Sequence, residues 1–127
     1  MNITIKTIPH REQRYDTAGD WWFDDEGDLQ IRVSDAGHGL WVLNLGWRYE
    51  ALIAFHELAE ALLCQARGIT TAQVDTFDKD HPYDDEPGAL RNCPYRKEHF
   101  FATTVERLLA AELKVDWNDY DAVISEL

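Results

Sequence analysis

The chain has 127 residues, of which 45% are hydrophobic and 12% aromatic, enough for one compact domain with an apolar core and too few for two ordinary domains. Its 24 acidic and 12 basic residues give a formal net charge of -12, which argues against nucleic acid as a partner because no basic surface exists to neutralise phosphates. The sequence shows no secretory signal, no stretch long enough to span a membrane, and only two cysteines. We therefore expect a single domain over 1–127, located in the reducing cytoplasm, with no membrane partner.

The N-terminal third is rich in strand signals. Isoleucines mark an opening strand over 3–8. A hairpin is predicted over roughly 20–34, because the aromatic run 21–23 and the alternating run 29–33 flank a polar, glycine-containing turn. The short apolar run 40–45 fits either a further strand or a loop that lies over the sheet.

Helical periodicity begins at Trp47 and continues to Ala66, just before a glycine that is typical of a helix end. The apolar residues that recur at helical spacing predict the core stripe of this helix: Leu52, Phe55, Ala59, Leu62 and Ala66. Further apolar residues widen the stripe until most of the circumference is covered, so we expect a buried helix.

The acidic segment 69–97, with its prolines, is predicted to be irregular, and a loop of this length is usually functional or partly disordered. A second long helix is predicted from Arg96 to Lys114, with a short helix after it that Asp116 or Asn118 would cap. The predicted core stripe of the second helix is Phe101, Val105, Leu108 and Leu109.

Together these elements predict an α+β fold. A small N-terminal antiparallel β-sheet in the strand-rich region 1–46 would pack against two long helices and a short C-terminal helix in the helical region 47–127.

The most informative segment is His56-Glu57-Leu58-Ala59-Glu60, inside the first predicted helix. Residues four apart project from the same side of a helix, so His56 and Glu60 stand together while Glu57 points about a quarter-turn away. This layout offers an imidazole and a carboxylate to a cation and leaves the neighbouring glutamate free to move protons. The segment therefore predicts half of a metal site.

The charge around this segment favours a cation over a simple ion pair. Between residues 51 and 64 the ionisable side chains besides Cys64 are His56, Glu57 and Glu60, so this is not an ordinary exposed helix face. Burying a carboxylate without a partner costs several kcal/mol, and that window holds no lysine or arginine. Either a metal ion compensates, or arginines from elsewhere reach in as ion pairs, the candidates being Arg91, Arg96 and Arg107.

His99, near the start of the second predicted helix, is the best candidate for a third ligand. With His56 and Glu60 it gives two imidazoles and a carboxylate, the composition of a catalytic zinc site that keeps a fourth position for water. Iron or manganese suits the same ligands. Glu57 is then the candidate general base that takes a proton from metal-activated water.

Other donors are weaker candidates. Glu106 lies two turns after His99 and is predicted to be either a further ligand or an acceptor for a ring N–H, the alternative being a pair with Arg107 or with solvent. His81 and Cys93 are alternative ligands. The remaining histidines in predicted loops are interpreted as surface residues: His10 and His38.

The helix bearing His56-Glu57-x-x-Glu60, followed by a second helix with a histidine, resembles the zincin-like metallopeptidase superfamily, with Glu60 where zincins have a second histidine. The chain is also similar to small uncharacterised phage and prophage proteins that combine a shared series of short motifs. In this chain those motifs are Gly19-Asp20-Trp21, Val33-Ser34-Asp35, His56-Glu57-x-x-Glu60, Glu86-Pro87-Gly88, Pro94-Tyr95-x-x-Glu98-His99 and Val115-Asp116-Trp117. These resemblances imply a strand-rich N-terminal region before a metal-site helix.

The leading functional hypothesis is a metal-dependent hydrolase, with a zincin-like peptidase as its most specific form. An alternative is a non-catalytic acidic metal-binding protein that interacts with a phage or host partner; it predicts a closed site with a fourth protein ligand, Glu106 or Cys93. A second alternative is a magnesium-dependent nucleotide pyrophosphatase, in which Glu57-x-x-Glu60 would need a second acidic pair on a later helix.

Overall fold

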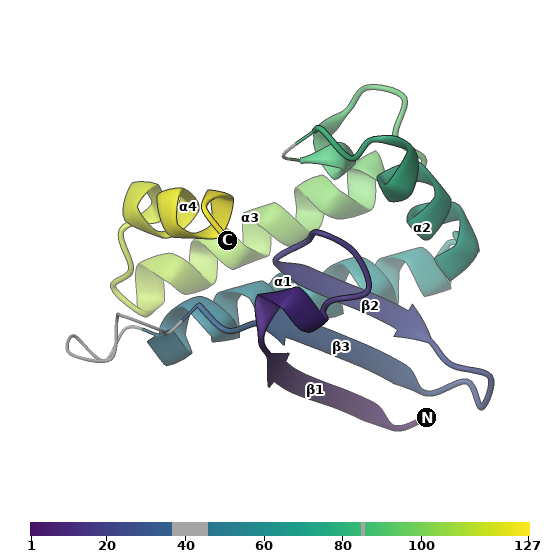
Figure 1. The fold of residues 1–127 in the computed structure, drawn as a ribbon, viewed down its shortest axis with the longest axis horizontal. Coiled ribbons are helices and arrows are strands. Elements are labelled where there is room, and N and C mark those ends of the chain that lie inside the picture. Colours follow the sequence, from purple (N-terminus) through teal and green to yellow (C-terminus); the bar gives the residue numbers. More distant parts are fainter. Residues whose placement is uncertain (37–45, 85) are drawn as a thin grey trace.

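A computed structural model describes residues 1–36, 46–84 and 86–127 of the chain (Figure 1). The described residues form an α+β fold, in which a three-stranded mixed sheet is combined with four α-helices. The strands are β1 (Ile3–Ile8), β2 (Gly19–Phe23) and β3 (Leu29–Ser34). The helices are α1 (Gly46–Ala66), α2 (Thr71–Asp80), α3 (Arg96–Glu112) and α4 (Trp117–Ser125), with short 3-10 turns η1 (His10–Glu12) and η3 (Pro87–Ala89). The predicted run 40–45, His38 and Trp41 lie outside the described residues.

The sheet has the order β1-β3-β2. The predicted hairpin is confirmed, because β2 pairs with β3 antiparallel, Trp21 opposite Ile31. The prediction of an all-antiparallel sheet was wrong, since β1 pairs with β3 in parallel, Ile5 beside Ile31. After β1, the connection 9–18 leads to β2 at the other edge of the sheet. The hairpin then brings β3 back into the position between β1 and β2. This gives β3 the central position, where its Leu29, Ile31 and Val33 are fully buried.

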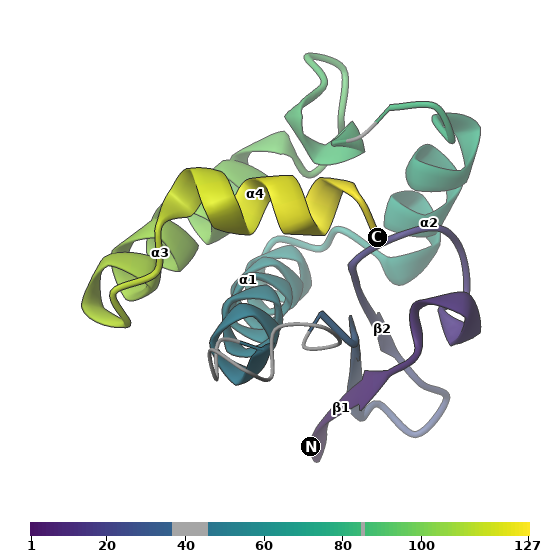
Figure 2. The same cartoon turned by 60° about the vertical axis from the view of Figure 1, so that its left-hand side comes forward.

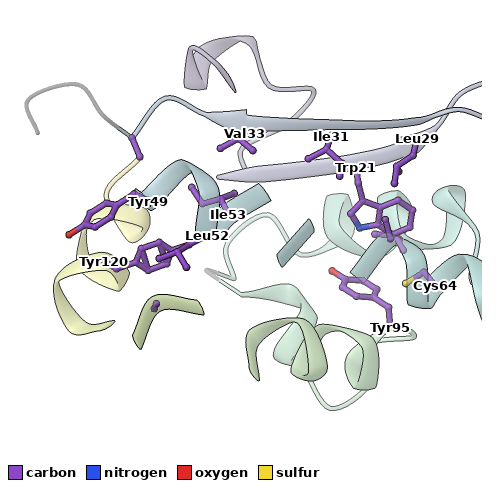
Figure 3. Packing of buried hydrophobic residues seen from close by; sticks show 14 of the residues in the cluster. Trp21, Leu29, Ile31, Val33, Tyr49, Leu52, Ile53, Cys64, Tyr95 and Tyr120 are labelled. Atoms are coloured by element: carbon purple, nitrogen blue, oxygen red, sulfur yellow. The ribbon is translucent and has the colours of Figure 1, made fainter. Parts of the chain in front are cut away.

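The hydrophobic core lies between the sheet and α1. Figure 3 shows the side chains of Trp21, Leu29, Ile31 and Val33 on the face of the sheet that is turned toward α1. Fully burying one such aliphatic side chain contributes about 1.5–3 kcal/mol, so this layer accounts for much of the stability. The layer therefore fixes the position of α1, the helix that carries the His-Glu-x-x-Glu segment.

The long helix α1 ends as predicted. Gly68 has a φ of +73°, the left-handed conformation that glycine adopts without steric cost. Its amide and that of Ile69 donate to the carbonyls of Gln65 and Cys64, which terminates the helix in a Schellman motif. The helix and its stop signal were both readable from the sequence.

The predicted core stripes of the two long helices were partly wrong. Leu52 of α1 is fully buried, but Phe55 and Leu62 are each 41% exposed. In α3 the buried side instead carries Ala102, Ala110 and polar residues, while Phe101 and Leu108 are 52% and 65% exposed. The small alanines let α3 run close beside α1, so the large apolar residues of both helices turn outward.

The acidic segment after α1 is more ordered than predicted. It contains α2, whose first turn is fixed by a capping box between Thr70 and Gln73, and the turn η3. Helix α3 was predicted to end at Lys114, two residues beyond its observed end. Of the two candidates for the N-cap of α4, Asp116 and Asn118, the structure has Asp116. Figure 2 shows α4 lying along α3. Of the helices in the described stretches of the chain, none combines the length and the apolar character needed to cross a bilayer.

Candidate metal centre

Three side chains from two helices converge between α1 and α3. Glu60 Oε2 lies 3.3 Å from His56 Nε2 and 3.0 Å from His99 Nδ1. Each side chain is 11% exposed or less, and within the described residues they form a buried group whose donor atoms all lie within 4.8 Å of one another. Tetrahedral bonds of about 2.1 Å place neighbouring ligand atoms roughly 3.4 Å apart, so this group could bind a metal ion.

The far nitrogen of His56 is held by a second carboxylate. His56 Nδ1 lies 2.9 Å from Glu106 Oε1, and the Tyr120 hydroxyl donates to the other oxygen of Glu106 at 2.5 Å. This chain of contacts runs from α1 through α3 to α4 and fixes the orientation of the imidazole. Glu106 was predicted to be a further ligand, an acceptor for a ring N–H, or a partner of Arg107 or solvent. In the structure its carboxylate contacts a ring nitrogen of His56, and Glu106 lies outside the converging group.

His99 is held in the same manner from the other side. Its Nε2 lies 2.9 Å from Glu86 Oε1, in the segment that leads into η3. Gly88 then passes so close to the ring that a Cβ at this position would lie 2.5 Å from His99 Cγ and Nδ1. A glycine is therefore required here for the close approach of η3 to the imidazole.

The second oxygen of Glu60 also has a partner. Trp21, which points from β2 into the core, donates its indole N–H to Glu60 Oε1 at 3.0 Å. Each of the three side chains therefore points one nitrogen or oxygen atom toward the shared centre. Its other nitrogen or oxygen atom contacts a residue outside the group. In metalloproteins such outer contacts orient the ligands and select the histidine tautomer.

The pKa values of the group reflect its mutual contacts. Burial alone would lower the pKa of His99, but hydrogen bonds to Glu60 and Glu86 outweigh it and raise that pKa to about 9. The pKa of His56 is likewise raised, because its contacts with Glu106 and Glu60 overcome the cost of burial. Burial would raise the pKa of Glu60, yet its hydrogen bonds with the two histidines lower it to about 2.

Glu57 differs from its neighbours because its carboxylate makes no hydrogen bond with any described residue. It lies against β2, where a Cβ at Gly19 would be 2.6 Å from Glu57 Oε1. Burial, and then the nearby charge of Glu60, raise the pKa of Glu57 well above its ordinary value. Glu57, His56, Glu60 and His99 together line a cavity of about 120 Å³.

A larger cleft of about 730 Å³ adjoins this cavity and shares His56, Glu57 and Glu86 with it. Asp78 of α2 also lines this cleft. It accepts hydrogen bonds from the hydroxyls of Tyr15 and Tyr95, and burial raises its pKa to about 6. Among the described residues that line the cleft, seven are acidic and one, Lys79, is a lysine or arginine. The approach to the candidate metal centre is therefore strongly acidic.

The other candidates from the sequence lie elsewhere in the described structure. His81 hydrogen-bonds the carbonyl of Phe77 and stacks on its ring. Cys93 is buried outside the converging group, with its thiol pKa raised to about 11 by burial. His10 contacts Ser34 and Asp16. None of the described arginines pairs with Glu57 or Glu60, and two of the predicted candidates instead stack on aromatic rings: Arg96 on Phe100 and Arg107 on Trp117.

Sequence reasoning missed the residues that support the group from outside. Trp21 was predicted as part of the aromatic run in the hairpin, and Glu86 and Tyr120 were given no role in the site. The motif Glu86-Pro87-Gly88 was a usable signal, since its glutamate contacts His99 and its glycine makes room for that ring. Comparisons with protein-family models, with curated proteins and with solved structures found no match to this chain.

Proposed function

We propose that this protein is a metal-dependent hydrolase in which His56, Glu60 and His99 hold the cation and Glu57 is the general base. Zinc is the metal we expect first, because two imidazoles and one carboxylate are a common catalytic zinc set, with iron or manganese as alternatives. A zincin-like peptidase is the most specific form of the proposal. The observation that carries it is the convergence of three buried donor atoms, each held from behind by another residue.

The position of Glu57 supports catalysis over a purely structural metal site. A closed structural site needs a fourth protein ligand, and the converging group of the described residues has three members. Glu57 lines the same cavity and has no hydrogen-bond partner among the described residues, so its carboxylate is free to accept a proton. A bound cation would activate water and polarise the substrate, which is the chemistry that this chain's side chains lack.

The acidic cleft supports a neutral or cationic substrate, such as a peptide. Its carboxylates would repel the phosphates of a nucleotide, which weighs against the magnesium-dependent pyrophosphatase. We therefore favour amide hydrolysis over phosphate chemistry.

The first experiment separates a metal site from a network of ion pairs. Protein purified without a histidine tag is analysed for bound metals, alongside His56→Ala, His99→Ala and the matched control His81→Ala. The proposal expects about one metal per chain in the wild type and the control, and a loss in the two site variants. A wild type without metal would show that the histidines and carboxylates only pair with each other.

The second experiment separates an enzyme from a structural metal protein. Glu57→Gln keeps the size of the side chain but removes the base, so it should retain metal and abolish cleavage of a mixed peptide library read by mass spectrometry. Glu126→Gln, an exposed position, is the control. Metal-loaded wild type that cleaves no peptide in the library would support the non-catalytic interaction protein, and hydrolysis of nucleoside triphosphates would support the pyrophosphatase.

A further inference from the structure

The helix pair α1 and α3 has an exposed apolar side, which we call the outer face and define by Phe55 and Leu62 of α1 and Phe101 and Leu108 of α3. These four side chains are between 41% and 65% exposed. In Figures 1 and 2 the sheet and α4 lie on one side of the helix pair, and no other described helix or strand covers its other side. Exposed apolar patches that span two elements generally mark an interaction surface. The outer face is therefore a candidate binding surface.

The outer face of α1 has a symmetric pattern of residues. Phe55 and Leu62 lie equally far from a midpoint between residues 58 and 59, and Ala51 and Ala66 flank them at equal distances. Outside the candidate metal centre, α1 carries no charged side chain from 51 to 66. Two such helices can therefore pack against each other in antiparallel orientation, with each large residue facing a large residue.

The outer face of α3 repeats this symmetry and adds charge complementarity. Phe101 and Leu108 lie equally far from a midpoint between residues 104 and 105. Lys97 and Glu112, both exposed, lie equally far outside them and carry opposite charges. When two copies of α3 pair antiparallel about this midpoint, each Lys97 meets Glu112 of the other copy.

The two midpoints lie at nearly the same height along the helix pair. His56 contacts Glu106 and Glu60 contacts His99, which aligns the middle of α1 with that of α3 to within about one helical turn. One two-fold axis, perpendicular to the helices, can therefore pass near both midpoints. The seven-residue spacing of the large residues is also the repeat that fills the interface of a four-helix bundle.

We propose that the outer face is the interface of a symmetric homodimer, in which α1 packs on α1 and α3 on α3 of a second copy. Phe55 and Phe101 of each copy then face Leu62 and Leu108 of the other, and two Lys97–Glu112 pairs close the ends. The candidate metal centres and the clefts beside them lie on the other side of the helix pair, away from this interface. This proposal is independent of the proposed hydrolase activity.

Sedimentation equilibrium across a wide dilution series tests the dimer. The wild type should approach twice the 14.7 kDa chain mass at high concentration. Leu108→Glu places a carboxylate in the apolar interface and should give a monomer with unchanged circular dichroism, since Leu108 is 65% exposed in the single chain. A wild type that stays monomeric, or a dimer that persists in Leu108→Glu, would overturn the proposal.

A charge swap tests the geometry of the interface without disturbing its apolar residues. Lys97→Glu should weaken the dimer about tenfold, because two like-charged pairs replace two opposite ones. Adding Glu112→Lys to the same chain restores opposite charges and should restore the dimer. The matched control is Lys6→Glu on β1, which should leave the dimer unchanged. A double variant that remains as weak as Lys97→Glu would contradict the antiparallel pairing.

Discussion

The inner and outer sides of the α1–α3 pair differ in what they bury. On the inner side His56, Glu60, His99 and Glu106 are largely hidden from solvent, although burying such groups is costly. On the outer side the phenylalanines and leucines remain exposed in the single chain. The helix pair is arranged around its polar centre, and its exposed apolar stripe is the surface that we propose for association.

The largest effect is expected from removing the centre of the inner side. Glu60→Ala leaves two buried imidazoles and the Trp21 indole N–H without their shared acceptor. Breaking a buried charged network in this way costs about 3–5 kcal/mol. Urea unfolding in the presence of a chelator measures the loss without a contribution from bound metal. Glu126→Ala is the exposed control, and a loss no larger than in that control would contradict the network.

The pH dependence of Asp78 gives the next largest effect. Because burial raises its pKa from 3.8 to about 6, the folded state binds this proton more tightly than the unfolded state does. The stabilisation is therefore complete below the unfolded pKa and is lost as the pH rises through about 6. Relative to Asp78→Asn, the wild type should lose at most about 3 kcal/mol between pH 4 and pH 7. Parallel stability curves for the two proteins would mean that Asp78 is not buried as described.

A smaller effect is expected where the inner side is held from behind. Tyr120→Phe removes the hydroxyl that donates to Glu106, the partner of His56. We expect a loss of about 2 kcal/mol in stability, because a hydrogen bond to a charged group is removed, and a metal affinity about tenfold lower. Chelator competition measures the affinity. Tyr83→Phe serves as the control because Tyr83 is 97% exposed, and equal affinities in the two variants would argue against an orienting role for Tyr120.

The smallest effect on folding is expected on the outer side. Leu108→Ser should change the stability of the monomer by no more than about 0.5 kcal/mol, since the side chain is already mostly in water. The measurement is urea unfolding at a concentration low enough to dissociate any dimer. If Leu108→Ser lowered the free energy of unfolding as much as Glu60→Ala does, the two sides of the helix pair would not differ as described.

Local signals in the sequence gave much of the fold. The hairpin, the opening strand, the stop of α1 at Gly68 and the cap of α4 by Asp116 all depend on residues close together in the chain. The parallel pairing of β1 could not be predicted in this way, because it depends on a long-range choice of neighbour. Helix α2 was missed although Thr70 and Gln73 form a capping box, since its acidic and polar residues masked the helical period.

The candidate site was predictable in its motif and in its third member. Spacing placed His56 beside Glu60, and the charge-poor helix around them indicated burial. His99 was chosen as the third member because it lies near the start of the second long helix, and the structure brings the three together. The predicted core stripes were partly wrong because hydrophobic periodicity identifies the apolar face of a helix. It does not show whether that face packs in the core or lies at the surface. Contacts such as Trp21 with Glu60 join residues far apart in the sequence and carry no local signal.

The central claim is tested most directly by the metal content of tag-free protein, wild type against His99→Ala. Our account predicts about one bound divalent metal per wild-type chain, most of it zinc, and almost none in His99→Ala, with His81→Ala like the wild type. Wild-type protein that carries no metal and binds none when zinc is added would contradict it, and so would an unchanged metal content in His99→Ala.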